Sequence, residues 1–193
     1  MSDIAPSRLV ILDRDGVINE DSDAYIKSVD EWVPVPGSIA AIARLSRAGF
    51  KIAVATNQSG LARGYFDEFA LANMHALLCE LVEEAGGHVD AICYCPHGPD
   101  EGCRCRKPAP GLLERISAEL HVPLAGAWYV GDTVKDIELG LAMACRPILV
   151  RTGKGRQAEQ TLDVALRQSI VVVDDLAEAA NWILGAQTGV GEG

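Results

Sequence analysis

The sequence predicts a three-layer α/β fold in which a Rossmann-like parallel sheet lies between two layers of helices. Short apolar runs alternate with longer stretches of helical periodicity, which is the order of elements that builds a parallel sheet. Each run is almost continuously apolar, as in strands that are buried on both faces. Of the 193 residues 49% are apolar, enough for one well-filled core and few for two. We therefore expect residues 1–185 to form a single domain, followed by a flexible tail over residues 186–193.

Six apolar runs are expected to form the strands of this sheet. They are Leu9–Leu12, Lys51–Thr56, Ala91–Tyr94, Ala127–Val130, Pro147–Val150 and Ile170–Val173. Apolar residues recur at helical spacing from Ile39 to Leu45 and from Phe69 to Val82, which predicts two helices. Further helices are expected from Pro110 to about Leu120, near Gln157 to Arg167, and from Asp174 through Leu184.

The charge and the absence of long apolar segments exclude several classes of function. The formal net charge is −10, from 17 basic and 27 acidic residues, whereas a broad nucleic-acid or acidic-membrane surface needs clustered lysines and arginines. The chain has no apolar run long enough to span a membrane, and Met1 to Arg8 lack the layout of a secretory signal. We expect a cytoplasmic protein that binds neither nucleic acid nor membrane. No apolar surface stripe is left over for a partner, which favours a monomer.

Polar motifs follow four consecutive strands of the expected sheet. They are Asp13-Arg14-Asp15-Gly16, Thr56-Asn57-Gln58-Ser59-Gly60, Arg106-Lys107-Pro108 and Gly131-Asp132-Thr133-Val134-Lys135-Asp136. Open parallel sheets bind ligands at the carboxyl ends of their strands, where such motifs would meet. Each motif alone has an ordinary reading as a turn or a capped helix start. Their occurrence together, in this order, indicates one polar site.

Three carboxylates, those of Asp13, Asp15 and Asp132, are expected to approach that site. Gly16 permits the sharp turn that brings the first two together. Gathering three negative charges is costly unless a hard cation such as Mg²⁺ binds their oxygens. The cluster therefore indicates a magnesium site.

With these four motifs the chain resembles the haloacid dehalogenase superfamily from Leu9 to about Val150. The resemblance implies a phosphatase in which Asp13 attacks phosphorus and Asp15 acts as general acid and then base. It also implies that Asp13, the Asp15 carbonyl and Asp132 hold Mg²⁺, while Thr56 and Lys107 bind the phosphoryl oxygens. The role of Asp136 is open: it could orient Lys107, contact a metal-bound water, or serve only as a first-turn helix carboxylate.

A cysteine-rich loop follows the third expected strand. Cys95, His97, Cys103 and Cys105 provide three thiolates and one imidazole, a set that suits a closed, structural zinc site. Zinc would order a segment that cannot form a core and would place Arg106 and Lys107 beside the phosphate. Cys93 is a rival ligand, but burial in its strand is the better interpretation. Cys79 and Cys145 are expected to be small core residues on helices.

Within the superfamily, this loop resembles the branch that removes the 7-phosphate of D-glycero-D-manno-heptose 1,7-bisphosphate in lipopolysaccharide precursor synthesis; histidinol-phosphate phosphatases share most of its features. No connection is long enough for a cap domain, so loops must set specificity. The residues expected to contact a small phosphorylated sugar are Asn19, Asp21, Ser22, Asn57, Gln58, Ser59, Arg106 and Thr133. A bisphosphate needs a second anion site, for which the candidates are Lys27, Arg63, Arg104 and Arg106. Val17-Ile18-Asn19 departs from the usual Thr-Ile-Asn, which makes contacts in the first loop less secure than the catalytic ones.

Two other classes of protein share parts of this pattern. A phospho-signalling receiver domain also has an acidic magnesium pocket, a threonine and a lysine, but it lacks the carboxylate two residues after the phosphate acceptor. Asp15 therefore favours turnover over storage of a phosphoryl group. A nonenzymatic zinc-binding module would leave the acidic cluster and Lys107 unexplained.

Overall fold

A computed structural model describes residues 7–188 and has a single parallel sheet at its centre. The strand order is β3-β2-β1-β4-β5-β6. The strands are β1 (Leu9–Leu12), β2 (Lys51–Asn57), β3 (Ala91–Cys95), β4 (Trp128–Gly131), β5 (Arg146–Val150) and β6 (Val171–Val173). Each lies within one residue of its predicted bounds, and the predicted parallel α/β fold is confirmed.

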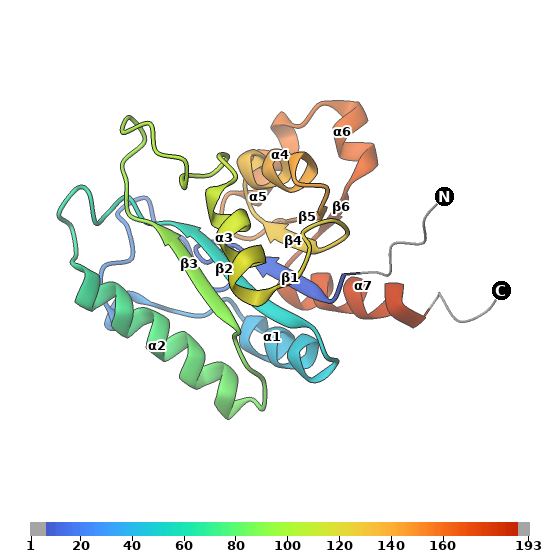
Figure 1. The fold of residues 1–193 in the computed structure, drawn as a ribbon, viewed down its shortest axis with the longest axis horizontal. Coiled ribbons are helices and arrows are strands. Elements are labelled where there is room, and N and C mark those ends of the chain that lie inside the picture. Colours follow the sequence, from blue (N-terminus) through green and yellow to red (C-terminus); the bar gives the residue numbers. More distant parts are fainter. Residues whose placement is uncertain (1–6, 189–193) are drawn as a thin grey trace.

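Helices cover both faces of the sheet (Figure 1). One layer contains α1 (Ser38–Arg47), α2 (Glu68–Glu84) and α7 (Leu176–Thr188). The other contains α3 (Gly111–Leu120), α4 (Val134–Ala142), α5 (Gly155–Thr161) and α6 (Val164–Ser169). A short 3-10 turn, η1 (Val29–Glu31), precedes α1. No helix within residues 7–188 is long and apolar enough to cross a membrane.

Successive side chains of the central strand enter different cores, because strand side chains alternate between the two faces of a sheet. Val10 and Leu12 pack in the cluster formed with α1, α2 and α7. Leu9 and Ile11 pack in the cluster formed with α3 and α4. All four are fully buried, which explains why the run is apolar without interruption.

The order of the strands places the site. From β1 the chain adds β2 and β3 on one side, then crosses back and adds β4, β5 and β6 on the other. The carboxyl ends of β1 and β4 therefore border the crevice at a topological switch point, where open α/β sheets bind ligands. Asp13 follows β1 there, and its N–H donates to the Val130 carbonyl at 2.9 Å.

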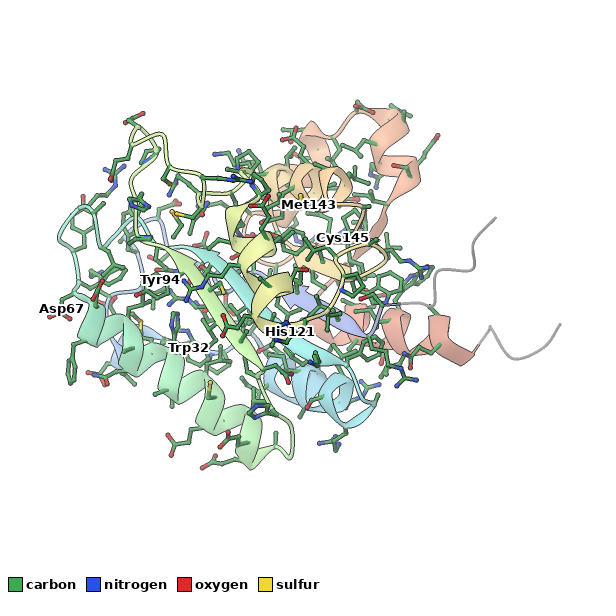
Figure 2. The ribbon with its side chains drawn as sticks, in the orientation of Figure 1. Trp32, Asp67, Tyr94, His121, Met143 and Cys145 are labelled. Atoms are coloured by element: carbon green, nitrogen blue, oxygen red, sulfur yellow. The ribbon has the colours of Figure 1, made fainter. Side chains whose placement is uncertain are left out.

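Four details of the predicted elements were wrong. Phe69 lies two positions before Leu71, on the side of α2 opposite its buried face, and is 74% exposed. The helix expected near Gln157 to Arg167 is two helices, because Leu162 is extended and Asp163 caps α6 by accepting from Leu166 N at 2.7 Å. Cys145 is buried as expected, but it lies in the connection between α4 and β5 (Figure 2). Helix α7 continues through Thr188, beyond its expected end at Leu184, and residues 189–193, most of the expected tail, lie outside the described part of the chain.

Candidate active site

An acidic cluster with one ammonium group lies at the carboxyl ends of β1 and β4. Ligand atoms of Asp13, Asp132 and Asp136 lie within 4.8 Å of one another, and all three residues are buried. The Lys107 Nζ is 2.8 Å from Asp13 Oδ2 and 2.8 Å from Asp136 Oδ1. Two of these carboxylates therefore share one cation, whereas Asp132 forms no ion pair within residues 7–188.

The three carboxyl groups differ in pKa because they differ in their distance from Lys107 and in their hydrogen bonds. Burial raises the pKa of Asp13 to about 7 although Lys107 lowers it, and burial together with Asp13 raises the pKa of Asp132 to about 8. Burial also opposes ionisation of Asp136, but Lys107 and hydrogen bonds hold the pKa of Asp136 below its usual value. The negative charge that is not balanced by Lys107 or by hydrogen bonds is thus centred on Asp13 and Asp132, the pair expected to bind magnesium.

Lys107 is fixed from two directions. Its main chain exchanges two hydrogen bonds with the Asn57 amide, through Lys107 N to Oδ1 at 3.0 Å and Nδ2 to the Lys107 carbonyl at 3.2 Å. Its partner Asp136 accepts from Tyr129 OH at 2.8 Å and from Thr133 Oγ1 at 2.5 Å. Asp136 and Thr133 also form a capping box at the start of α4. Asp136 therefore orients Lys107 and belongs to a helix cap at the same time, two of the readings left open by the sequence.

Asp15 is held by a buried arginine. Arg14, only 1% exposed, donates from Nη2 to Asp15 Oδ1 at 2.8 Å and from Nε to the same oxygen at 3.1 Å. The amides of Asn19 and Gln58 donate to the two carboxylate oxygens at 2.9 and 2.8 Å. Burial disfavours the ionised form, but Arg14 and these hydrogen bonds lower the pKa of Asp15 overall. In the free site Asp15 is thus a carboxylate.

Behind Arg14 lies His75 of α2, whose Nε2 is 3.4 Å from Arg14 Nη1. Burial and the arginine lower the pKa of His75 to about 4, so the imidazole is neutral near pH 7. Sequence reasoning missed this support for Asp15. Arg14 stood inside a motif, but nothing in its neighbours showed that it would be buried, and His75 is one of several polar residues on a long helix.

Two glycines allow the backbone to close around Asp132. A Cβ on Gly16 would lie 2.1 Å from Asp132 Oδ2, and one on Gly153 would lie 2.2 Å from it. Both glycines have positive φ, of 81° and 55°. The same oxygen accepts from Lys154 N at 2.8 Å. The loop after β5, which carried no predicted site residue, therefore forms part of the cluster.

The cluster opens into a cleft of about 500 Å³. The predicted residues that line it are Asp13, Asp15, Asp21, Ser22, Thr56, Asn57, Gln58, Ser59, Arg106, Lys107, Asp132 and Thr133. Asn19 does not: it is fully buried, and its amide donates to Asp15 and to the Glu20 carbonyl. Its expected contact with substrate is replaced by support of Asp15. Asn57 reaches the cleft, but its amide is occupied by the Lys107 main chain.

Only one of the four basic residues proposed for a second anion site lines the cleft. Arg106 does so, and its Nη1 donates to the His97 carbonyl at 3.1 Å. Lys27 pairs with Glu31 and Arg104 pairs with Glu114, both outside the cleft, and Arg63 does not line it. Two lysines that had not been assigned to this role, Lys135 and Lys154, do line it.

The cysteine loop brings its four expected ligands together. The Cys95, Cys103 and Cys105 sulfurs lie 3.2 to 3.6 Å apart, and His97 Nδ1 is 3.6 Å from Cys95 Sγ and 3.2 Å from Cys105 Sγ. In a tetrahedral zinc site with bonds of about 2.0–2.3 Å, ligand atoms are separated by roughly 3.3–3.8 Å. The four side chains are therefore compatible with one zinc ion. Cys93 is not part of the group; its sulfur is 3.9 Å from Glu119 Oε2.

The raised pKa values of Asp13 and Asp132 give magnesium binding a specific pH dependence. Mg²⁺ binds the ionised carboxylates, so protons compete with it once the pH falls below about 7 for Asp13 and about 8 for Asp132. We expect the affinity for Mg²⁺ to fall by roughly 10-fold or more between about pH 8.5 and about pH 6.5, with proton release on binding. Calorimetric titration in buffers of different ionisation enthalpy measures both quantities.

Asp132→Asn serves as the control for this titration. It removes one ionisable ligand and should weaken binding at every pH while reducing the number of protons released. An affinity for Mg²⁺ that is independent of pH in the parent protein would contradict this electrostatic description of the cluster.

Comparison with known proteins agrees with this geometry. The HAD-hydrolase-like family model matches residues 104–179. The D-glycero-beta-D-manno-heptose-1,7-bisphosphate 7-phosphatase of Pseudomonas aeruginosa is 57% identical over 176 residues, which cover 91% of this chain and 97% of the relative. The enzyme of the same name from Bordetella bronchiseptica is 48% identical over 177 residues, covering 92% of this chain and 98% of that relative.

Solved structures give the same result. The crystal structure of D,D-heptose 1,7-bisphosphate phosphatase from B. bronchiseptica, complexed with magnesium and phosphate, superposes with a TM-score of 0.86 at 47% identity. The match covers 92% of this chain and 98% of that one. The corresponding phosphatase from Burkholderia thailandensis has a TM-score of 0.70 at 38% identity, with coverage of 91% and 97%. This chain therefore belongs to the D-glycero-beta-D-manno-heptose-1,7-bisphosphate 7-phosphatase family of HAD-like hydrolases.

Proposed function

We propose that this chain is a magnesium-dependent phosphomonoesterase that removes the 7-phosphate of D-glycero-β-D-manno-heptose 1,7-bisphosphate in the synthesis of lipopolysaccharide precursors. The observation that carries the proposal is the buried group of Asp13, Asp132 and Lys107 at the switch point of the sheet, open to a polar cleft. The sugar and its β anomer come from the names of relatives that match almost the whole chain. Histidinol phosphate carries only one phosphate, so as substrate it would give no function to the further basic side chains that line the cleft.

Asp13 is the nucleophile in this proposal. Its Oδ1 accepts from Arg14 N at 2.7 Å and its Oδ2 faces Lys107, so the carboxylate is fixed before substrate arrives. Attack on phosphorus forms the Asp13–phosphorus bond and breaks the bond to the sugar oxygen. Thr56 and Lys107 bind the other phosphoryl oxygens as charge builds on them.

Asp15 moves the proton in both steps. It gives a proton to the leaving sugar oxygen, and in the second step it takes one from the water that displaces Asp13 from phosphorus. Arg14 and Gln58 favour the ionised carboxylate, which is the form required for the second step. The proton for the first step is favoured once the phosphate lies beside Asp15, because a nearby negative charge raises the pKa of a carboxyl group.

Two metal ions complete the proposal. Asp13, Asp132 and the Asp15 carbonyl would hold Mg²⁺, which offsets the charge of nucleophile and phosphate when it is bound. The relative of known structure from B. bronchiseptica contains magnesium and phosphate, which supports this choice. Cys95, His97, Cys103 and Cys105 would hold a structural Zn²⁺ that keeps Arg106 and Lys107 in place. We also propose that the protein works as a monomer in the cytosol, where the thiols stay reduced.

The substrate assignment is tested by phosphate release. We expect Mg²⁺-dependent turnover with a kcat/KM for the heptose bisphosphate at least about 10-fold above that for histidinol phosphate or a nucleotide monophosphate. The α and β anomers are assayed side by side. Preference for histidinol phosphate would contradict the substrate assignment while leaving the chemistry intact.

Asp13→Asn is the matched catalytic control, because it keeps the size of the side chain and removes the nucleophilic charge. It should lose turnover by a factor on the order of 10³ or more. Residual activity close to that of the parent protein would remove Asp13 from its role.

The zinc assignment is tested by metal analysis of protein purified without chelators. The parent protein should contain zinc in about equal amount to protein, and the double variant Cys103→Ser, Cys105→Ser should lose it together with most of kcat, because the loop no longer positions Lys107. Cys79→Ser, on α2 and outside the cluster, is the control that should keep its zinc. A parent protein free of zinc and fully active would overturn the assignment.

A further inference from the structure

A substrate with two phosphates needs a second cationic site, and Lys107 cannot supply it. Its ammonium lies between Asp13 and Asp136 at 2.8 Å from each, at the floor of the cleft. The phosphate that is not hydrolysed is at the other end of the sugar, so its partners must lie farther out. Among residues 7–188 the other basic side chains that line the cleft are Arg106, Lys135 and Lys154.

Lys154 is fixed at both ends. Its N–H donates to Asp132 Oδ2 at 2.8 Å, which ties its backbone to the acidic cluster. Its Nζ crosses to the loop after β1 and lies 3.2 Å from Asp21 Oδ2 and 3.7 Å from Asp23 Oδ1. Asp23 is 97% exposed, so this contact is at the mouth of the cleft, whereas the cluster is at its floor. One residue thus connects the position of the reacting phosphate with the entrance.

The contacts of Lys154 are weak enough to be exchanged. The side chain is 52% exposed, and ion pairs in such positions contribute little because water and salt screen them. A phosphate group carries more charge than a carboxylate and accepts short, charge-assisted hydrogen bonds. An incoming phosphate can therefore displace Asp21 and Asp23 from the ammonium.

Arg106 and Lys135 are the other basic side chains available to a phosphate in the cleft. Arg106 is anchored through Nη1 to the His97 carbonyl, on the side of the cleft formed by the cysteine loop. Lys135 is exposed at the start of α4 and has no ion-pair partner within residues 7–188. The three cations follow three different strands, β3, β4 and β5, so a phosphate bound by all of them would connect three segments that border the cleft.

Resting on the proposed function, we propose that Lys154, with Arg106 and Lys135, binds the phosphate that is not hydrolysed, and that Asp21 and Asp23 hold its ammonium at the mouth of the cleft until that phosphate arrives. Lys154 is then a specificity-determining residue, which selects sugars with two phosphates over sugars with one.

The test compares heptose 1,7-bisphosphate with heptose 7-phosphate, which lacks only the second phosphate. In Lys154→Met, which keeps the length of the side chain and removes its charge, the ratio of the two kcat/KM values should fall by roughly 10-fold. The Ki of the product heptose 1-phosphate should rise by a similar factor. Lys51→Met, at the opposite end of β2, is the matched control and should leave the ratio unchanged.

Asp23→Asn tests the competition in the opposite direction. It removes a rival for the ammonium, so the KM for the bisphosphate should fall by roughly 2-fold to 3-fold. A rise in that KM would overturn the role given to Asp23. If Lys154→Met lowers kcat/KM equally for both substrates, the Lys154 ammonium does not contact the second phosphate and the proposed site is wrong. If the parent protein hydrolyses neither sugar, the proposed function itself has failed, which the parent assay reveals before any variant is compared.

Discussion

The structure depends on one electrostatic constraint: three buried carboxylates and a single buried ammonium group occupy the end of the central strands. Burial raises the energy of each charge, and removing one partner of such a group leaves an uncompensated charge in the interior. Lys107 is the shared cationic partner of Asp136 and Asp13, so it balances only one of their two charges. Within residues 7–188 the Asp132 carboxylate accepts only a main-chain hydrogen bond, from Lys154 N–H. The remaining charge is a site for a divalent cation.

The residues of this cluster are placed by several loops, each of which follows a different strand. The switch point brings the ends of β1 and β4 together, and Gly16 and Gly153 let two turns close on Asp132 without steric conflict. Lys107 comes from outside the sheet, on a loop with little apolar content of its own. That loop is fixed by Asn57 at one side, and the Cys95, His97, Cys103 and Cys105 group, which is compatible with one zinc ion, lies at the other. The proposed zinc ion would therefore serve the reaction only by position.

The strands and most of the residues that line the site could be predicted from the sequence, for a physical reason. Strands buried on both faces are continuous apolar runs, and site residues in such folds stand directly after them, so the strands and the motif residues could be located together. What could not be predicted depends on which way a side chain turns. Asn19 and Asn57 stand in the right loops, but their amides hold Asp15 and Lys107, and Arg14 is buried although its sequence neighbours are acidic. Lys154 follows β5, where no site residue was predicted, and only the hydrogen bond from its N–H to Asp132 shows that it belongs to the cluster.

The most direct test of the central claim is to locate the phosphoryl group during turnover. Asp13 and Asp136 both pair with Lys107 and line the cleft, but the Asp13 side chain is 13% exposed, whereas that of Asp136 is 1% exposed and also accepts from Tyr129 and Thr133. A turnover mixture with the heptose bisphosphate, quenched in acid within the first catalytic cycle and analysed by peptide mass spectrometry, should carry phosphate on the peptide that contains Asp13. In Asp13→Asn, which lacks the nucleophile, this species should be absent. Phosphate on another residue, or none under conditions in which product forms, would contradict the role of the Asp13 and Lys107 pair.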